Sequence, residues 1–326
     1  HRPLDDQGQA EDAEVATHLY AVIAMASRSG LGSATATRHD PPDDDQGDDE
    51  DRLVVVVARA SDGWVLFADT NGDGSLADER PLHDYLIARE TFGWSGSGRL
   101  APMTVAVNFG ASTTTPSLDL YFDNSGHGTH VSGIAAGHGL YGVAGFDGVA
   151  PGAQLLGLKI SNNAFGGISV TGSMLRAMDY AIRFAQARKL PLVLNLSFGV
   201  GNEREGAARI DAIVDSVLAA NPEVIFSTSA GNDGPGLSTM GFPGSADRVT
   251  SVGATLPPAF TGGTELTGDV VAFFSSRGGE FAKPDILAPG IAYSSVPRWE
   301  TGSENKNGTS MASPHRSEEH TSELQS

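Results

Sequence analysis

From residue 103 onward, short apolar runs alternate with stretches whose apolar residues recur every three to four positions. The runs predict strands at residues 105–109, 154–160, 192–198 and 224–228. The helical spacing predicts two helices with buried faces, the first formed by Leu175, Met178, Ile182 and Ala185 and the second by Ile210, Ile213, Val214, Val217 and Leu218. This alternation is typical of an α/β fold that has a mainly parallel sheet flanked by helices, with a site at the carboxyl ends of the strands.

Upstream of residue 103 the pattern is different. Residues 53–58 and 64–68 are apolar runs on either side of Ser61, Asp62 and Gly63, which predicts a β-hairpin. Residues 40–51 include eight acidic residues out of twelve, which predicts an exposed linker. We therefore expect an acidic, partly disordered segment over residues 1–52 and an inserted hairpin region over residues 53–102.

An acidic loop follows the predicted hairpin. Asp69, Asn71 and Asp73 match the first half of a calcium loop of the D-x-N-x-D-G type. The twelfth position, where such a loop has a bidentate Glu, is Arg80. The pattern leaves two alternatives, a structural calcium site and a plain hairpin loop, and it favours the plain loop.

Composition and charge exclude several classes of function. The 326 residues include no Cys, so disulfides and thiolate metal sites cannot form. The net charge is −19, which argues against nucleic acid as a partner. No stretch is long and apolar enough to span a membrane.

A motif that predicts a nucleophile occupies residues 308–314, which read Gly-Thr-Ser-Met-Ala-Ser-Pro. Ser310 falls where a glycine turn enters a helix, and Ser and Thr are well suited to helix starts. The free N–H groups of a helix start also favour negative charge nearby. Taken alone, the motif fits an ordinary helix cap as well.

Two further motifs supply partners for Ser310. Residues 127–130 read His-Gly-Thr-His, and His127 is the candidate base because imidazole titrates near neutrality, while His130 fits a capping or core role. Residues 230–234 read Ala-Gly-Asn-Asp-Gly. The Asn232 side chain and the backbone N–H of Ser310 are candidates to bind an oxyanion, although Asn-Asp-Gly also suits a simple turn.

Together the three motifs resemble the subtilase family of serine proteases, in which the His, Asn and Ser motifs follow the same order. The resemblance covers roughly residues 103–315. It implies a subtilisin-like three-layer α/β fold and hydrolysis of peptide bonds through an acyl-enzyme on Ser310, without a required cofactor. It also implies that extended substrate pairs with the chain, and that the residues around the substrate are Ser197, Phe198 and Gly199 near S2–S4 and Ser229, Ala230 and Gly231 at S1.

Residues 231–241 and 296–299, and the long insertion ahead of the His motif, are similar to the tripeptidyl-peptidase II-like branch of the family. In that branch acidic residues hold the free amine of the substrate. One of them would fall near Ser169 and Val170, and neither residue is acidic here. We therefore expect an endopeptidase acting on peptides or proteins, with a tripeptidyl exopeptidase as the alternative. A secreted or cell-envelope location is favoured over a cytoplasmic one.

The family's triad also needs a carboxylate, carried in an apolar-Asp-Thr/Ser-Gly run that this chain lacks. Asp69 is the nearest candidate, but we favour a carboxylate upstream of residue 1. Residues 316–326 match the translation of a common sequencing-adapter oligonucleotide, and we expect them to be a non-native tail. The chain is therefore expected to contain an incomplete catalytic domain over residues 103–315, with little activity of its own, or to be an inactive peptide-binding fragment.

Overall fold

The computed structural model describes residues 21–26, 52–94, 103–110, 117–123, 126–162, 168–169, 171–201, 204–260, 268–297 and 304–324. The chain forms two compact units. The first comprises residues 1–126, 162–168 and 297–301, and the second comprises residues 127–161, 169–296 and 302–326. The first unit thus includes residues 103–126, which the sequence analysis placed in the catalytic domain.

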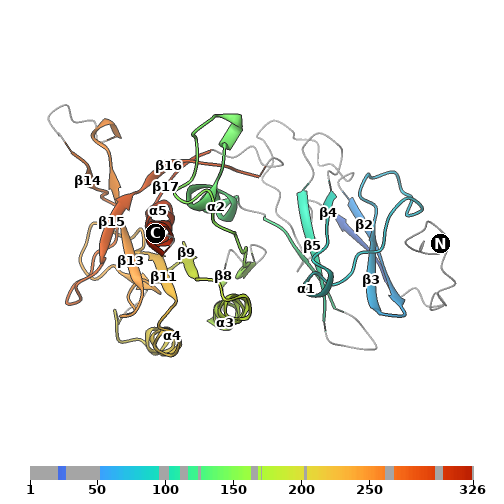
Figure 1. Ribbon diagram of the computed structural model, residues 1–326, viewed down its shortest axis with the longest axis horizontal. Coiled ribbons are helices and arrows are strands. Elements are labelled where there is room, and N and C mark those ends of the chain that lie inside the picture. Colours follow the sequence, from blue (N-terminus) through green and yellow to red (C-terminus); the bar gives the residue numbers. More distant parts are fainter. Residues whose placement is uncertain are drawn as a thin grey trace. The chain divides into compact units, whose positions relative to one another are not determined.

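The first unit contains two antiparallel sheets, β1–β2–β3 and β4–β5–β6 (Figure 1). Its elements are β1 (Ala21–Ala26), β2 (Arg52–Ala60), β3 (Gly63–Ala68), α1 (Tyr85–Ala88), β4 (Thr91–Trp94), β5 (Met103–Phe109) and β6 (Leu118–Tyr121). The predicted hairpin is confirmed as β2 and β3. Strand β1 was not predicted, and it pairs with β2 from within the segment expected to be partly disordered.

The core of this unit is built from alternate residues of its strands. Leu53, Val55 and Val57 of β2 are buried in one cluster with Val105 and Val107 of β5, because side chains two positions apart share a face of a strand. The strand predicted at 105–109 is confirmed, but its assignment to the parallel sheet is wrong. It pairs antiparallel with β4 and β6, which flank it closely in sequence and so need only short connections.

The second unit contains a mainly parallel sheet and the longer helices. Strands β9 (Val193–Leu196), β11 (Ile225–Ser229), β13 (Thr250–Leu256) and β15 (Ile286–Pro289) are parallel, and β14 (Val270–Val271) pairs antiparallel with β13. The helices are α2 (His127–Ala136), α3 (Thr171–Arg188), α4 (Arg209–Ala220) and α5 (Thr309–Leu324). The predicted helices are confirmed as α3 and α4.

Short strands form the remaining ladders of the described chain. They pair as β7 (Ser161–Asn162) with β8 (Ile168–Ser169), β10 (Val200–Gly201) with β12 (Gly241–Phe242), and β16 (Ile291–Tyr293) with β17 (Asn305–Asn307). The hairpin of β16 and β17 leads directly into α5, so it positions the start of that helix.

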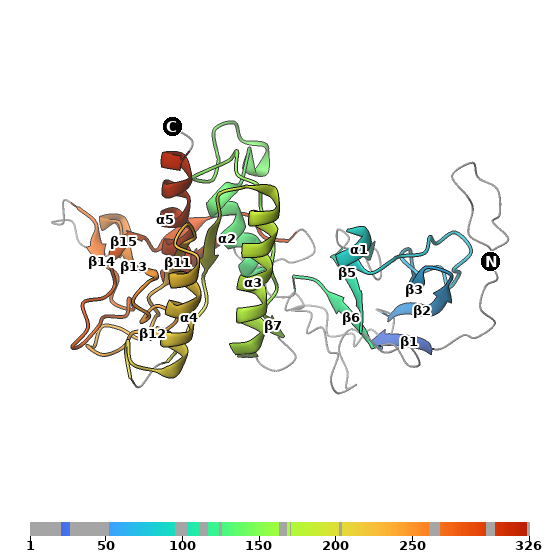
Figure 2. The same ribbon diagram turned by 60° about the horizontal axis from the view of Figure 1, so that its bottom comes forward.

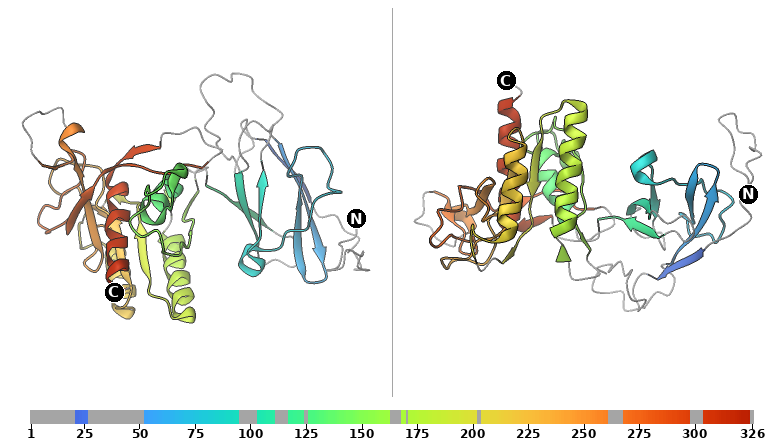
Figure 3. Two further views of the ribbon diagram at one scale, coloured as in Figure 1. Left: turned by 45° about the horizontal axis from the view of Figure 1, so that its top comes forward. Right: turned by 90° about the horizontal axis from the view of Figure 1, so that it is seen from below.

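The parallel sheet is the middle of three layers, with α3 and α4 on one face and α5 on the other (Figures 1 and 2). Leu194 of β9 and Phe226 of β11 pack with residues of α3 and α4, which run side by side (Figure 3). The next residues, Asn195 and Ser227, face α5 and bond to its Ser313. Alternation along these strands thus gives the sheet one apolar face and one face of small polar residues.

One expectation about the second unit fails. Residues 154–160 form no strand, and Leu155 and Leu156 are 58% and 36% exposed, since no described strand pairs with this segment. Residues 316–324 continue the helix that begins at Thr309, and the expectation that they are a non-native tail stays a prediction. None of the helices in the described part is long and apolar enough to cross a bilayer.

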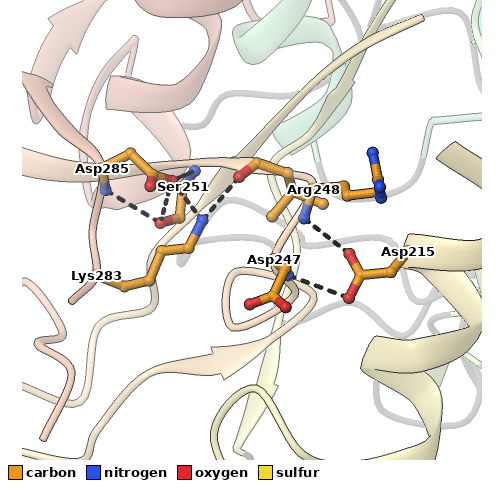
Figure 4. A network of polar contacts seen from close by, with 7 residues as sticks. Asp215, Asp247, Arg248, Ser251, Lys283 and Asp285 are labelled. Carbon is orange, nitrogen blue, oxygen red and sulfur yellow. Dashed lines mark hydrogen bonds and ion pairs between the residues drawn. The ribbon is translucent and has the colours of Figure 1, made fainter. Parts of the chain in front are cut away.

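A polar network joins the amino ends of β13 and β15 (Figure 4). The Asp285 carboxylate accepts hydrogen bonds from the N–H of Ser251 at 2.7 Å and from its hydroxyl at 3.1 Å, and Lys283 Nζ pairs with it at 2.6 Å. Asp215 of α4 accepts two N–H groups of the loop that precedes β13. This network lies at the end of the sheet opposite the predicted site, so its contacts join the strands and do not involve the candidate site residues.

Candidate active site

The candidate nucleophile lies where β17 turns into α5. Gly308 has a φ of +142°, a conformation that favours glycine, and its N–H donates to Gly290 O at 2.8 Å. Thr309 is the first residue of α5, and Ser310, the second, is half-buried. The prediction that Ser310 follows a glycine turn at a helix start is confirmed.

Asn232, just beyond the carboxyl end of β11, is bonded to this turn. Its Oδ1 accepts hydrogen bonds from Thr309 N–H at 2.9 Å and from Thr309 Oγ1 at 3.0 Å, while Thr309 Oγ1 accepts one from Gly231 N–H at 3.2 Å. A backbone N–H can only donate, so the amide atom that faces Thr309 must be the oxygen. The Nδ2 group of Asn232 is therefore on the other side of the amide and is not used in the contact with Thr309.

Ser197, at the carboxyl end of β9, satisfies the backbone of Ser310. Pro314 has no N–H, so the Ser310 carbonyl lacks its usual helical donor four residues later. The Ser197 hydroxyl donates to this carbonyl at 2.7 Å, and Ser310 Oγ lies 3.4 Å from the carbonyl oxygen of Ser197. The sequence analysis assigned Ser197 to substrate binding only and missed this contact.

A chain of hydrogen bonds continues from Ser197 beneath the first turn of α5. Asn195 Nδ2 donates to Ser197 Oγ at 3.1 Å, and Asn195 Oδ1 accepts from Ser313 Oγ at 2.7 Å. Ser313 Oγ also lies 3.2 Å from Ser227 Oγ. The sequence analysis missed these residues, although small polar residues within apolar strands were a usable signal.

The candidate base His127 is the first residue of α2 and is half-buried. One turn later, Val131 packs with Ile134 and with Met311, the neighbour of Ser310. The base and the nucleophile are therefore carried on the first turns of two helices that pack together.

His130 is fully buried, as expected for a core residue. Its Nε2 lies 2.8 Å from the carbonyl oxygen of Glu304. Burial lowers the pKa of His130, which outweighs the opposite effect of the bond to Glu304. The buried ring therefore favours the neutral form more than a free imidazole does.

The predicted substrate-binding residues meet at one edge of the site. Strands β9 and β11 are parallel neighbours with Leu196 opposite Thr228, so their next residues lie at the same end of the sheet. Ser229 and Ala230 are buried, whereas Gly231 and Phe198 are half-buried and Gly199 is exposed. The structure thus brings the following residues together: Ser197, Phe198, Gly199, Ser229, Ala230 and Gly231.

The acidic loop belongs to the first unit, whereas His127, Asn232 and Ser310 belong to the second. The buried Asp69 carboxylate accepts the N–H groups of Gly72, Asp73 and Gly74 at 2.8, 3.2 and 2.9 Å. The loop's own N–H groups thus occupy both oxygens of the runner-up triad carboxylate.

Hydrogen bonds within the acidic loop also bear on whether it can bind calcium. Asn71 donates its amide to Asp78 at 3.0 Å, and Glu79 bonds to Thr70. Within the described ranges, no three or more acidic or His side chains are arranged to hold a metal ion. These contacts suit the plain loop better than a calcium site formed by Asp69, Asn71 and Asp73, and calcium binding stays a prediction.

A serine at one helix start, a histidine at another and an amide donor at the carboxyl ends of parallel strands characterise a hydrolase with a serine nucleophile. The family model of the subtilase family matches residues 101–318, and the chain belongs to this family of serine peptidases. The predicted family and the three-layer α/β fold are thereby confirmed.

Individual relatives agree with this assignment. Tripeptidyl-peptidase 2 of Drosophila melanogaster is 29% identical over 267 residues, which cover 78% of this chain and 18% of that protein. Subtilisin E of Bacillus subtilis is 32% identical over 213 residues, covering 64% of this chain and 48% of that protein. The crystal structure of tripeptidyl peptidase 2 matches with a TM-score of 0.57 at 26% identity, over 82% of this chain and 20% of that chain. The chain thus spans about a fifth of tripeptidyl-peptidase 2 and about half of subtilisin E.

Proposed function

We propose that the protein hydrolyses peptide bonds through an acyl-enzyme on Ser310. Ser310 Oγ attacks the carbonyl carbon of the substrate while His127 takes its proton. His127 then gives this proton to the leaving amine as the C–N bond breaks. Water hydrolyses the resulting ester by the same route and restores the Ser310 hydroxyl.

The orientation of the Asn232 amide is the observation that carries this proposal. Its Oδ1 is fixed by two donors of Thr309, so Nδ2 is the group left to face an oxyanion formed at Ser310. A donor whose position is set before the reaction stabilises the developing negative charge at little reorganisation cost. The Ser310 backbone N–H, in the first turn of α5, serves as the second donor.

The carboxylate that orients His127 remains to be assigned. Asp69 already accepts three N–H groups of its own loop, so we retain the proposal of a carboxylate upstream of residue 1. The exposed Leu155 and Leu156 support it, because an additional strand would cover such apolar surface.

We further propose that the protein is an endopeptidase rather than a tripeptidyl exopeptidase. The test compares one peptide in two forms, with a free and with an acetylated N-terminus, and maps the products by mass spectrometry. An endopeptidase cleaves both forms at the same internal bonds. An exopeptidase releases tripeptides from the free form alone, and that result would contradict the proposal. Ser310→Ala is the control and abolishes cleavage.

A further inference from the structure

His130 makes a buried polar contact that the proposed reaction does not use. Its side chain is 0% exposed, and its Nε2 lies 2.8 Å from the carbonyl oxygen of Glu304. Because a carbonyl oxygen only accepts, Nε2 must carry the proton. Its Nδ1 has no hydrogen-bond partner within the described part of the chain. An apolar side chain of similar volume would fill the same space without burying an unpaired nitrogen.

Ser294 and Ser295, which follow β16, bond to α2 at two more points. The Ser294 hydroxyl donates to the carbonyl of His130 at 2.8 Å, and the Ser295 hydroxyl donates to that of Thr129 at 3.2 Å. A Cβ on Gly133 would come within 2.3 Å of Ser294 Oγ and 2.4 Å of Ser295 Oγ. Only glycine allows the helix to approach the segment this closely.

Glu304, which His130 contacts, lies shortly before the nucleophile Ser310 in the chain. Glu304 O accepts the N–H of Ser294 at 2.9 Å as well as Nε2–H of His130, so it is a fixed point between the two chain segments. From Glu304 the chain continues through β17 into Gly308 and Ser310. His130 itself lies on α2, one turn after the start where His127 is located.

Apolar contacts alone would fix this geometry poorly. Val131, Ile134 and Met311 join α2 to α5, but van der Waals contacts between apolar side chains are non-directional and tolerate small shifts. A hydrogen bond tolerates much less change in distance and angle. Misplacement of reacting groups by about 1 Å can cost on the order of 10²-fold in rate.

We propose that His130 is a positioning residue, whose bond to Glu304 sets the spacing between the base His127 and the nucleophile Ser310. The inference rests on the proposed function. In this role His130 affects kcat through the positions of His127 and Ser310 and does not contact the substrate.

The test compares His130→Leu with His130→Gln in the full-length protein. Leu keeps most of the volume and removes the donor, whereas Gln places an N–H near the position of Nε2. We expect His130→Leu to lower kcat and the labelling rate of Ser310 by a fluorophosphonate about 10- to 100-fold, with KM changed less than about twofold. We expect His130→Gln to recover both rates to within about threefold. The matched control is His138→Leu. The His138 side chain is 80% exposed and lies just after the same helix, so this variant leaves both rates unchanged.

Two results would overturn the proposal. One is an unchanged rate in His130→Leu, and the other is an equal loss in the Leu and Gln variants. Hydrogen exchange tests the contact without catalysis: the Ser294 amide, which shares Glu304 O with His130, should exchange faster in His130→Leu. Unchanged exchange there also refutes the proposal. A wild-type protein that resists labelling but shows faster Ser294 exchange in His130→Leu would refute the proposed function and leave the structural contact standing.

Discussion

Replacement of Asn232 by Asp separates the two functions of its side chain. The Oδ1 atom accepts two hydrogen bonds from Thr309, and Nδ2 is the proposed donor to the oxyanion. Asp keeps an oxygen for Thr309 but replaces the donor with a second oxygen that repels negative charge. Asn232→Ala removes both functions. The pair of variants therefore distinguishes anchoring of the turn from catalysis.

The magnitudes follow from these contacts. Loss of one oxyanion donor costs roughly 10²–10³-fold in kcat, about 2.7–4 kcal/mol, a value that comes from subtilisin itself. We expect kcat to fall by at least this factor in both variants. It should be lower in Asn232→Asp than in Asn232→Ala, because the second carboxylate oxygen repels the oxyanion. Two hydrogen bonds of about 0.5–1.5 kcal/mol each are lost in Asn232→Ala, so its free energy of unfolding should fall by about 1–3 kcal/mol. Asn232→Asp should keep most of that stability.

The assay measures kcat and KM on a chromogenic peptide in the full-length protein, and the free energy of unfolding by urea titration. KM should change little, because the donor acts mainly in the transition state. If Asn232→Asp retained kcat within threefold of wild type, Nδ2 would not be the oxyanion donor. If both variants lost equal stability, the bonds to Thr309 would not anchor the turn.

Three further predictions test other parts of the account. Lys283→Met should lower the free energy of unfolding by about 1–2 kcal/mol while kcat stays unchanged, since its Nζ pairs with Asp285 at the amino ends of the parallel strands, opposite the carboxyl ends where the candidate site lies; a large drop in kcat in the folded variant would contradict this. Asp69→Ala should leave Ser310 labelling unchanged, whereas a triad carboxylate would make the rate fall on the order of 10⁴-fold. His130 should make stability depend on pH: burial lowers its pKa in the folded state, so the unfolded chain binds the proton first as pH falls below about 6.5, and stability decreases. Urea titrations from pH 8 to 5 should show a shallower decrease in His130→Gln, and equal slopes would argue against this assignment.

Local patterns in the sequence were enough to predict helices α3 and α4 and several of the strands, although not β1, and they predicted a strand at 154–160 that does not form. The apolar face of α3, with Met178 and Ile182, and the alternation in β2, with Val55 and Val57, are set by residues close in sequence. Strand partners are not set in this way. The strand at 105–109 was therefore found but assigned to the wrong sheet, because its pairing depends on β4 and β6.

The candidate site likewise contains residues that local motifs reveal and contacts that only the fold reveals. Ser310, His127 and Asn232 stand in motifs of a few residues, so the sequence alone was enough to propose them as candidates. The bond of Ser197 to the Ser310 carbonyl joins residues far apart in the chain, and the contact of His130 with Glu304 does so as well. Such contacts become visible only when the fold has brought the segments together.

The most direct test of the central claim is covalent labelling of Ser310. The full-length protein is treated with a fluorophosphonate at neutral pH, digested, and mapped by tandem mass spectrometry. The account predicts one phosphonylated residue, Ser310, with labelling abolished in Ser310→Ala and strongly slowed in His127→Ala. A folded protein that is not labelled, or that is labelled at another serine, would contradict it.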